Sequence, residues 1–154
     1  MQSPYIQDST VEGPVGLVLV ASHGRTNAMT LSLFSEVAHH PTTLWVSIAR
    51  SCYTHDLVLQ EGRFSLIVLH EKQKEITRLC GSVSGRDVDK CRQLRTYRNP
   101  EGFLFLEDAL VSVACRVRSA HDVDEHTLLI ADILGGEIET RRSTLRHLLL
   151  SDLR

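Results

Sequence analysis

The sequence predicts a mainly β protein: an antiparallel sheet closed as a barrel, with a few short helices. Short apolar runs rich in Val, Ile and Leu recur along the 154-residue chain. Most of these runs follow one another with turn signals between them and no helical crossover. Consecutive strands without crossovers favour an antiparallel barrel over a doubly wound parallel sheet.

The N-terminal third supplies three strands. Residues 1–13 are polar and contain Pro and Gly, so we expect a loose arm. Strands are predicted over 15–21, 29–34 and 43–49, separated by the turn His23-Gly24-Arg25 and by a break at His39-His40-Pro41. The run 29–34 alternates apolar and polar residues, which is typical of a half-buried strand.

Two helices flank the next strand. Thr54 is a candidate N-cap for a helix over 55–61, and Gly62 stands where a helix ends. A strand follows over 64–69, and then a short helix over 71–80 that Gly81 closes.

The C-terminal half begins with a polar stretch, residues 82–100, that has no periodicity and holds five basic residues between Arg86 and Arg98. Strands are predicted over 103–106, 109–118 and 127–134, with a turn at Gly135-Gly136. Leu145, Leu148 and Leu149 lie on one face of a predicted amphipathic helix over 141–150. We therefore divide the chain into an arm (1–13), a domain (14–140) and a helical tail (141–154).

Composition excludes several classes of function. Apolar residues make up 42% and charged residues 23%, and the formal net charge is -2. This balance gives no general basic field for nucleic acid. The longest apolar run is too short to cross a membrane, and no signal peptide is read at the N-terminus. The four cysteines have no CxxC spacing, so we expect reduced thiols in a soluble, cytoplasmic protein.

The first candidate site is the stretch Asn27-Ala28-Met29-Thr30-Leu31-Ser32. Polar side chains (Asn27, Thr30, Ser32) stand beside small ones, as a flat polar heterocycle lying against a strand requires. The alternative is that Thr30 and Ser32 simply face solvent on an alternating strand.

The second candidate is the strand–turn–helix segment from Ser47 through Arg50 and Ser51 to Thr54. Hydroxyls, one Arg and a helix N-terminus are a suitable set for a phosphate. It is not a P-loop, because GxxxxGK[ST] is absent. An ordinary Thr cap beside a solvated Arg is the alternative.

Other motifs are weaker. His126 follows Asp124-Glu125 between two predicted strands, where it can donate to a phosphate, assist a proton transfer or simply occupy a turn. No histidine pair has ligand spacing with carboxylates or cysteines, so no metal site is predicted. Gly81-Ser-Val-Ser-Gly85 matches a nucleophile elbow by letter but follows a helix instead of a strand.

Taken in order, these stretches resemble the flavin reductase-like family, whose fold is the FMN-binding split barrel. The resemblance covers roughly residues 14 to 138 and rests on four segments: 15–21, 27–34, 40–54, and 64–81 followed by Asp124-Glu125-His126. It implies a cytoplasmic homodimer that binds FMN and takes a hydride from NAD(P)H, supplying a partner monooxygenase or another acceptor.

The resemblance also assigns roles to residues. It implies that Asn27, Ala28, Met29, Thr30 and Ser32 border the flavin ring, that Ser47, Arg50, Ser51 and Thr54 hold the phosphate, and that Gly81 and Ser82 close the site. His126 takes the place of the histidine in the family's Gly-Asp-His motif, beside the nicotinamide. Here that motif reads Asp124-Glu125-His126, and its extra negative charge disfavours a nearby pyrophosphate. The alternatives are an FMN-binding electron-transfer or storage module without reductase turnover, and a β-barrel interaction domain without flavin.

Overall fold

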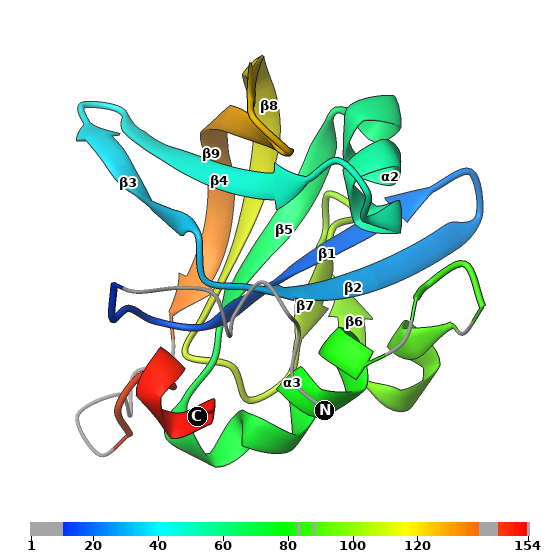
Figure 1. The fold of residues 1–154 in the computed structure, drawn as a ribbon, viewed down its shortest axis with the longest axis vertical. Helices are drawn as coiled ribbons and strands as arrows, with labels where there is room; N and C mark the ends of the chain where they lie inside the picture. The colour runs from blue at the N-terminus through cyan, green and yellow to red at the C-terminus, as the bar shows by residue number, and fades with distance from the viewer. Residues whose placement is uncertain (1–10, 83, 88, 139–144, 154) are drawn as a thin grey trace.

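A computed structural model describes residues 11–82, 84–87, 89–138 and 145–153. Its main element is a seven-stranded antiparallel sheet with the strand order β2-β1-β5-β8-β9-β4-β3 (Figure 1). A separate two-stranded sheet, β6-β7, lies beside it. The antiparallel, mainly β class predicted from the sequence is confirmed.

The strands are β1 (Gly16–Ser22), β2 (Arg25–Leu31), β3 (Phe34–His39), β4 (Thr42–Ala49), β5 (Arg63–Val68), β6 (Thr96–Arg98), β7 (Leu104–Leu106), β8 (Val111–Val123) and β9 (His126–Ile138). The α-helices are α2 (Tyr53–Glu61) and α3 (Lys74–Ser82). Short 3₁₀ turns are η1 (Glu71–Gln73), η2 (Lys90–Gln93) and η3 (Leu150–Leu153).

The sheet is curved but open. β2 and β3 stand at opposite ends of the strand order, yet only Ser32 and Leu33 separate them in the chain. A two-residue link spans only about 7 Å, so the sheet must curl back on itself to bring its ends together. No ladder joins β2 to β3, which makes the fold a split barrel rather than a closed one.

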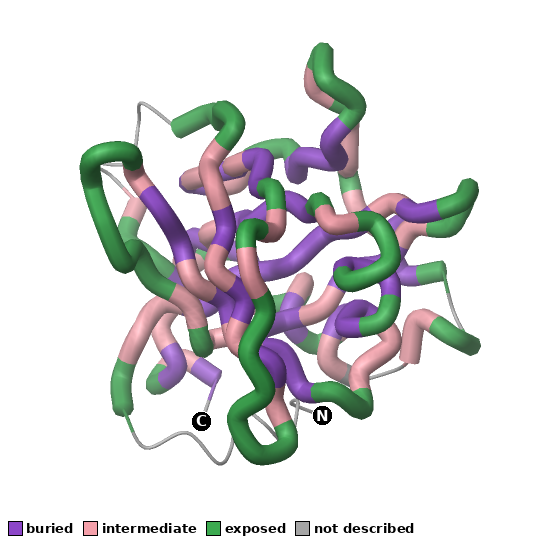
Figure 2. Tube along the Cα trace, turned by 90° about the horizontal axis from the view of Figure 1, so that it is seen from above, coloured by how far each residue is buried: buried purple, intermediate pink, exposed green. Residues whose placement is uncertain are grey.

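Strand β1, next to the edge strand β2, is buried on both faces. Leu17 and Leu19 belong to one apolar cluster, whereas Val18 and Val20 belong to another. Since successive strand side chains point to opposite faces, β1 separates the barrel interior from a second core outside the barrel. Figure 2 shows buried chain running through the centre of the molecule, whereas the loops, strand β3 and the ends of β8 and β9 are largely exposed.

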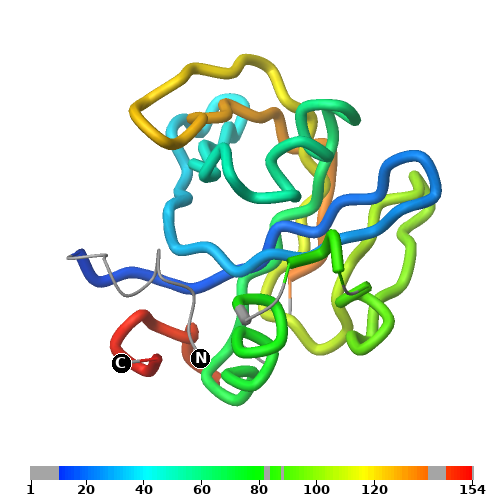
Figure 3. Tube along the Cα trace, turned by 45° about the vertical axis from the view of Figure 1, so that its right-hand side comes forward, coloured from blue at the N-terminus to red at the C-terminus, as the bar shows by residue number. Residues whose placement is uncertain are grey.

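Helix α2 contributes Leu57 and Val58 to the cluster around Val18. The outer core is covered by α3, the β7 strand and the C-terminal segment. Figure 3 shows α3 and the C-terminal segment near one another below the barrel. Among the described residues, no helix is long and apolar enough to cross a membrane.

Two predicted strand boundaries are wrong. The single strand expected over 29–34 is the end of β2 and the start of β3, divided at Ser32-Leu33. The turn expected at Gly135-Gly136 is absent, because both glycines lie inside β9. A Cβ on Gly136 would stand 2.6 Å from the carbonyl oxygen of Ser112. Gly136 therefore permits close approach of β8 and β9. The Gly135-Gly136 pair indicates a turn only when the packing of the two strands is unknown.

The helix predictions also need correction. Helix α2 begins at Tyr53 with Cys52 as N-cap and no side-chain cap, so Thr54 lies in the first turn instead of capping it. Gly62 ends α2 in the left-handed conformation (φ 71°), as predicted. Gly81 does not close the second helix, which continues through Ser82. The stretch 82–100 contains η2 and β6, which its polar composition conceals.

The amphipathic helix predicted over 141–150 is wrong for residues 145–149, which are not helical, and residues 139–144 lie outside those described. Leu149 instead forms a β-bridge with Pro14, and the Val15 N–H donates to the Leu148 carbonyl at 2.8 Å. Leu148 is fully buried in the outer core. The spacing of the leucines reflects an extended segment tucked into the core, not a helical face.

An ion pair holds this C-terminal segment. Arg146 makes a two-pronged contact with Asp152, with both nitrogen–oxygen distances at 2.8 Å. The Leu149 N–H also donates to Asp152 at 2.9 Å. These donors, chiefly Arg146, lower the pKa of the Asp152 carboxyl to about 2.

We expect Asp152→Asn to destabilise the protein at neutral pH by about 1 kcal/mol or less, as for exposed ion pairs. A depressed pKa in the folded state contributes stability above the unfolded pKa, and that contribution disappears as pH falls from about 4 toward 2. Urea unfolding of both proteins across this range should show the difference at pH 6 and its loss near pH 2. The exposed pair Glu75–Arg78 supplies the control Glu75→Gln, which should change little. A pH-independent difference would assign the effect to something other than the ion pair.

Candidate functional site

A cavity of about 210 Å³ lies between β2, the start of α2, the end of α3 and the loop that follows α3. It brings together several of the predicted site residues, from segments far apart in the sequence. Its lining comprises Asn27, Met29, Thr30, Ser51, Cys52, Tyr53, Thr54, Cys80, Gly81, Ser84, Gly85, Arg86 and Lys90. We refer to it as the β2 cavity.

Asn27 is the central polar group of the β2 cavity. Its amide nitrogen donates to the Thr54 hydroxyl at 2.7 Å, which ties β2 to the first turn of α2. Its amide oxygen is buried and has no hydrogen-bond partner among the described residues. A Cβ on Gly85 would stand 2.0 Å from that oxygen, so only glycine allows the loop to pass there. A buried acceptor without a donor is costly, and a ligand N–H can satisfy it.

Lys90 places a cation at the same cavity. The side chain is buried, and its ammonium donates to the Cys80 carbonyl at 3.0 Å. Burial lowers the pKa of Lys90 from its usual value. Burial raises the pKa of the Cys80 thiol to about 12, so that neighbour carries no charge at neutral pH. A buried ammonium favours an anionic ligand, because an anion offsets the cost of burying the charge.

Arg86 and Tyr53 form one rim of the cavity. The Arg86 guanidinium lies 5.0 Å from the centre of the Tyr53 ring and pairs with Asp56 at 3.2 Å. The Tyr53 hydroxyl accepts from Arg25 at 3.0 Å. The rim thus combines an aromatic ring with two cations, which suits a negatively charged or aromatic ligand.

A second, small cavity of about 20 Å³ lies on the other side of Met29 and Thr30, which line both spaces. Ser32, Ser47 and His126 also line this small cavity. His126 Nδ1 stands 3.1 Å from a carboxylate oxygen of Glu125. The pKa of Glu125 is lowered, first by a hydrogen bond from its own backbone N–H and further by His126 and Arg50. A negative charge therefore stays beside His126 at neutral pH.

The predicted set does not gather at one point. Ala28 is fully buried in the outer core and lines neither cavity. The Arg50 guanidinium donates to the carbonyls of His126, at 3.0 Å, and Asp124, which holds it against the β8–β9 hairpin. Ser82 is the last residue of α3, one position beyond Gly81. The solvent-facing alternative is wrong for Thr30, which is buried with its hydroxyl 3.4 Å from the Thr77 carbonyl.

Sequence reasoning missed Tyr53, Ser84, Gly85, Arg86 and Lys90 as members of one site. The signal for them was the excess of basic residues from Arg86 to Arg98, which looks like a solvated surface in sequence alone. Among the described residues, no group of three or more His, Cys, Asp or Glu side chains is placed to hold a metal.

The flavin reductase like domain model matches residues 9–151, and the chain belongs to that family. RutF of Methylorubrum extorquens, an FMN reductase (NADH), is 32% identical over 123 residues, which are 79% of this chain and 58% of RutF.

Two solved structures share the fold. The flavin reductase of styrene monooxygenase from Pseudomonas putida S12 is 25% identical, has a TM-score of 0.80, and matches 93% of this chain and 88% of its own. The FMN-binding protein of Thermus thermophilus is 27% identical, has a TM-score of 0.79, and matches 84% of this chain and 73% of its own. The family and the split-barrel fold that the sequence resembles are therefore confirmed, and the chain is a flavin reductase by family.

The contact between Gly85 and Asn27 predicts a sensitive position. In Gly85→Ala, the new methyl group must displace the Asn27 amide and break its hydrogen bond to Thr54. Loss of one buried hydrogen bond costs about 1–3 kcal/mol, so a flavin that contacts Asn27 should bind about 5- to 150-fold more weakly. Fluorescence titration with FMN measures this. Gly13→Ala is the matched control, because nothing lies within 4 Å of its Cβ position. Equal affinity in both variants would exclude Asn27 from the flavin site.

Proposed function

We propose that this chain is an FMN-binding, NAD(P)H-dependent flavin reductase and that the β2 cavity holds the flavin. The single observation that carries the placement is the pairing of a buried ammonium, Lys90, with a buried orphan acceptor, the Asn27 amide oxygen, in one cavity. FMN has a matching pair of groups: a phosphate and a ring system with an N–H donor.

The phosphate end is assigned to Lys90 together with Ser51, Thr54 and Ser84, which line the same cavity. The start of α2 faces this region, and a helix N-terminus favours an anion. Arg86 is close enough to join, through the rim it forms with Tyr53. Arg50, which the sequence assigns to the phosphate, contacts the β8–β9 hairpin in the chain described here.

The ring end is assigned to β2, with Asn27, Met29 and Thr30 along one wall and Ser32 and Ser47 beyond Met29. When bound, FMN would supply the redox chemistry of a flavin reductase. The residues of this chain bind the ring, keep its position against β2 and exclude water from it. His126 and Glu125 stand where the nicotinamide is expected, and the role we assign to His126 is orienting it.

Lys90→Gln tests the phosphate assignment. A charge-assisted contact is worth about 1.5–3 kcal/mol, so FMN affinity should fall about 10- to 100-fold. Riboflavin lacks the phosphate, and its affinity should stay within about twofold. The two titrations together separate loss of a phosphate contact from general damage to the fold, which would weaken both ligands equally. Lys72→Gln, at an exposed position, is the control for removing one positive charge.

The reductase activity itself is tested by mixing FMN-loaded protein with NADH or NADPH and following the loss of absorbance at the nicotinamide band. Turnover with either donor supports the proposal. His126→Ala should lower the rate about tenfold or more and should weaken FMN less than Lys90→Gln does, because His126 lines the small cavity beyond Met29 and not the β2 cavity. An unchanged rate would remove His126 from the reaction.

The second candidate function is an FMN-binding electron-transfer module without its own turnover. The Glu125 carboxylate beside His126 favours it, since that charge repels a dinucleotide pyrophosphate. Tightly held FMN with no oxidation of NADH or NADPH selects this candidate. Restoration of activity by Glu125→Gln would then identify the repulsion as the cause.

We also propose a homodimer in the cytoplasm, with a monooxygenase or another acceptor as the consumer of reduced flavin. Exposed apolar residues on one side of the barrel support the dimer: Leu33, Val37, Leu134 and Ile138 are 39–59% exposed. The styrene monooxygenase reductase supports the acceptor, because its name states that it serves a monooxygenase.

A further inference from the structure

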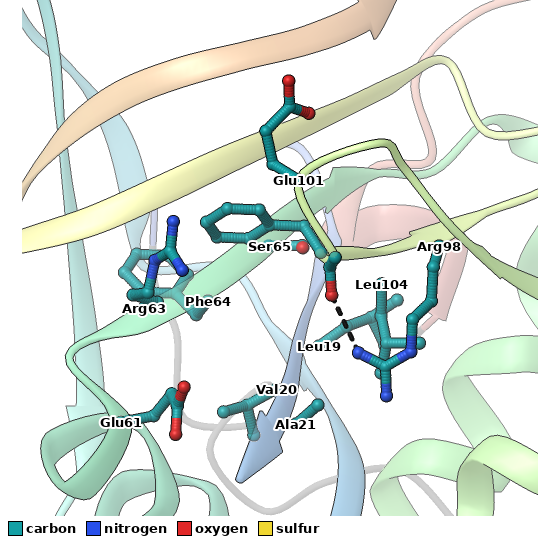
Figure 4. A pocket seen from close by; sticks show the side chains of 12 residues that line it. Leu19, Val20, Ala21, Glu61, Arg63, Phe64, Ser65, Arg98, Glu101 and Leu104 are labelled. Atoms are coloured by element: carbon teal, nitrogen blue, oxygen red, sulfur yellow. Dashed lines mark hydrogen bonds between the residues drawn. The ribbon is translucent and has the colours of Figure 1, made fainter.

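A third cavity, of about 100 Å³, opens where strands β1 and β5 separate. Their ladder ends at the pair Leu19–Ser65, although both strands continue past it. The turn between β6 and β7 covers the opening with Gly102 and Phe103. We call this space the β1–β5 notch (Figure 4). It shares no lining residue with the β2 cavity.

The notch has an apolar floor. Leu19, Val20, Ala21, Phe64 and Leu104 line it. Such a floor favours a ligand with a short hydrocarbon body, because it removes apolar surface from water at about 25 cal/mol per Å².

Two arginines stand at the rim of the notch. Arg63 lies 4.6 Å above the centre of the Phe103 ring, and Arg98 donates to the Gly102 carbonyl at 2.8 Å. Neither guanidinium makes an ion pair within 4.0 Å with a carboxylate of the described residues. Each keeps further N–H donors for an acceptor, since a guanidinium has five.

A buried hydroxyl adds a third polar contact. Ser65 is 1% exposed, and its hydroxyl has no hydrogen-bond partner among the described residues. Figure 4 shows the Ser65 oxygen lying between the side chains of Arg63 and Arg98 in this view. A buried hydroxyl without a partner costs about 1–3 kcal/mol, so it is unexpected at a position that serves packing alone.

Two carboxylates limit the charge of the ligand. Glu61 and Glu101 also line the notch, so its formal charges sum to zero. Figure 4 shows the Glu101 carboxylate directed away from the Arg98 guanidinium. A dianion such as phosphate meets more repulsion from these two carboxylates than a monocarboxylate does, and one guanidinium can hold a carboxylate through two parallel N–H bonds.

We propose that the β1–β5 notch binds a small monocarboxylate with a short apolar body. A water needs about 10–15 Å³ of such space, so the notch takes roughly seven to ten water-sized atoms. This is the size of a branched short-chain fatty acid or an aromatic acid. The carboxylate is expected on Arg63, Arg98 and the Ser65 hydroxyl, and the hydrocarbon against Leu19 and Phe64.

The test is calorimetric titration of the full chain with isovalerate and benzoate, each compared with its uncharged amide. The acid should bind at least tenfold more tightly than the amide, and inorganic phosphate should not compete. Arg63→Gln and Arg98→Gln should each weaken the acid about tenfold or more. Arg95→Gln is the matched control: it removes an exposed positive charge from the same segment, outside the notch, and should leave binding unchanged.

Ser65→Ala keeps the proposal testable if an arginine variant misfolds. It removes an unsatisfied hydroxyl, so the melting temperature should not fall, while isovalerate binding should weaken. Equal binding of acid and amide, or no saturable binding of either acid to wild-type protein, would overturn the proposal. FMN titration of the same samples distinguishes the two proposals. A chain that binds FMN but no carboxylate contradicts the notch proposal and leaves the proposed flavin site intact.

Discussion

The burial of β1 on both faces is the constraint on which the rest of the structure depends. Its side chains alternate between the barrel interior and the outer core, so neither core can be rearranged without moving the other. β1 also pairs with β2 on one edge and β5 on the other. The β2 cavity and the β1–β5 notch therefore lie on opposite sides of a two-stranded ribbon, and the register Val20–Asn27 links them directly. Because β1 is held by both cores, the β1–β2 pair can present binding groups along its two edges in fixed positions.

Charge at the β2 cavity is arranged around one buried cation. Lys90 lines the cavity from η2, and Arg86 lines it from the loop that precedes η2. The hydrogen bond between Asn27 and Thr54 connects the wall formed by β2 to the wall formed by α2. Binding of an anionic cofactor would offset the cost of burying Lys90 and give the orphan oxygen of Asn27 a donor. The Asn27 amide oxygen is thus a polar atom of the kind that a ligand, rather than the protein core, satisfies.

Local patterns in the sequence were sufficient for most of the strands and for the family. Alternation and apolar runs placed the ends of β1, β4 and β5 within one or two residues of their observed positions. These strands are buried, so their apolar side chains are visible in the sequence. Local sequence patterns gave wrong predictions where long-range packing determines the secondary structure. Gly135 and Gly136 look like a turn but serve close approach in β9, and the leucines at 145–149 look like a helix but fill the outer core as an extended segment. Lys90 was lost among surface charges, since only the folded chain shows that it is buried.

The position of β2 at the end of the sheet has a consequence for its motions. An edge strand is held by one ladder only, and its outer side is covered here by long side-chain contacts, such as Thr26 to Asp89 at 3.4 Å and Thr30 to the Thr77 carbonyl. Strands of this kind open more readily than central ones. The amides of β2 should thus exchange with solvent sooner than those of β1, and ligand binding should slow the exchange of the β2 amides. At the proposed flavin site, the bound ligand would thus complete the β2 wall of the cavity.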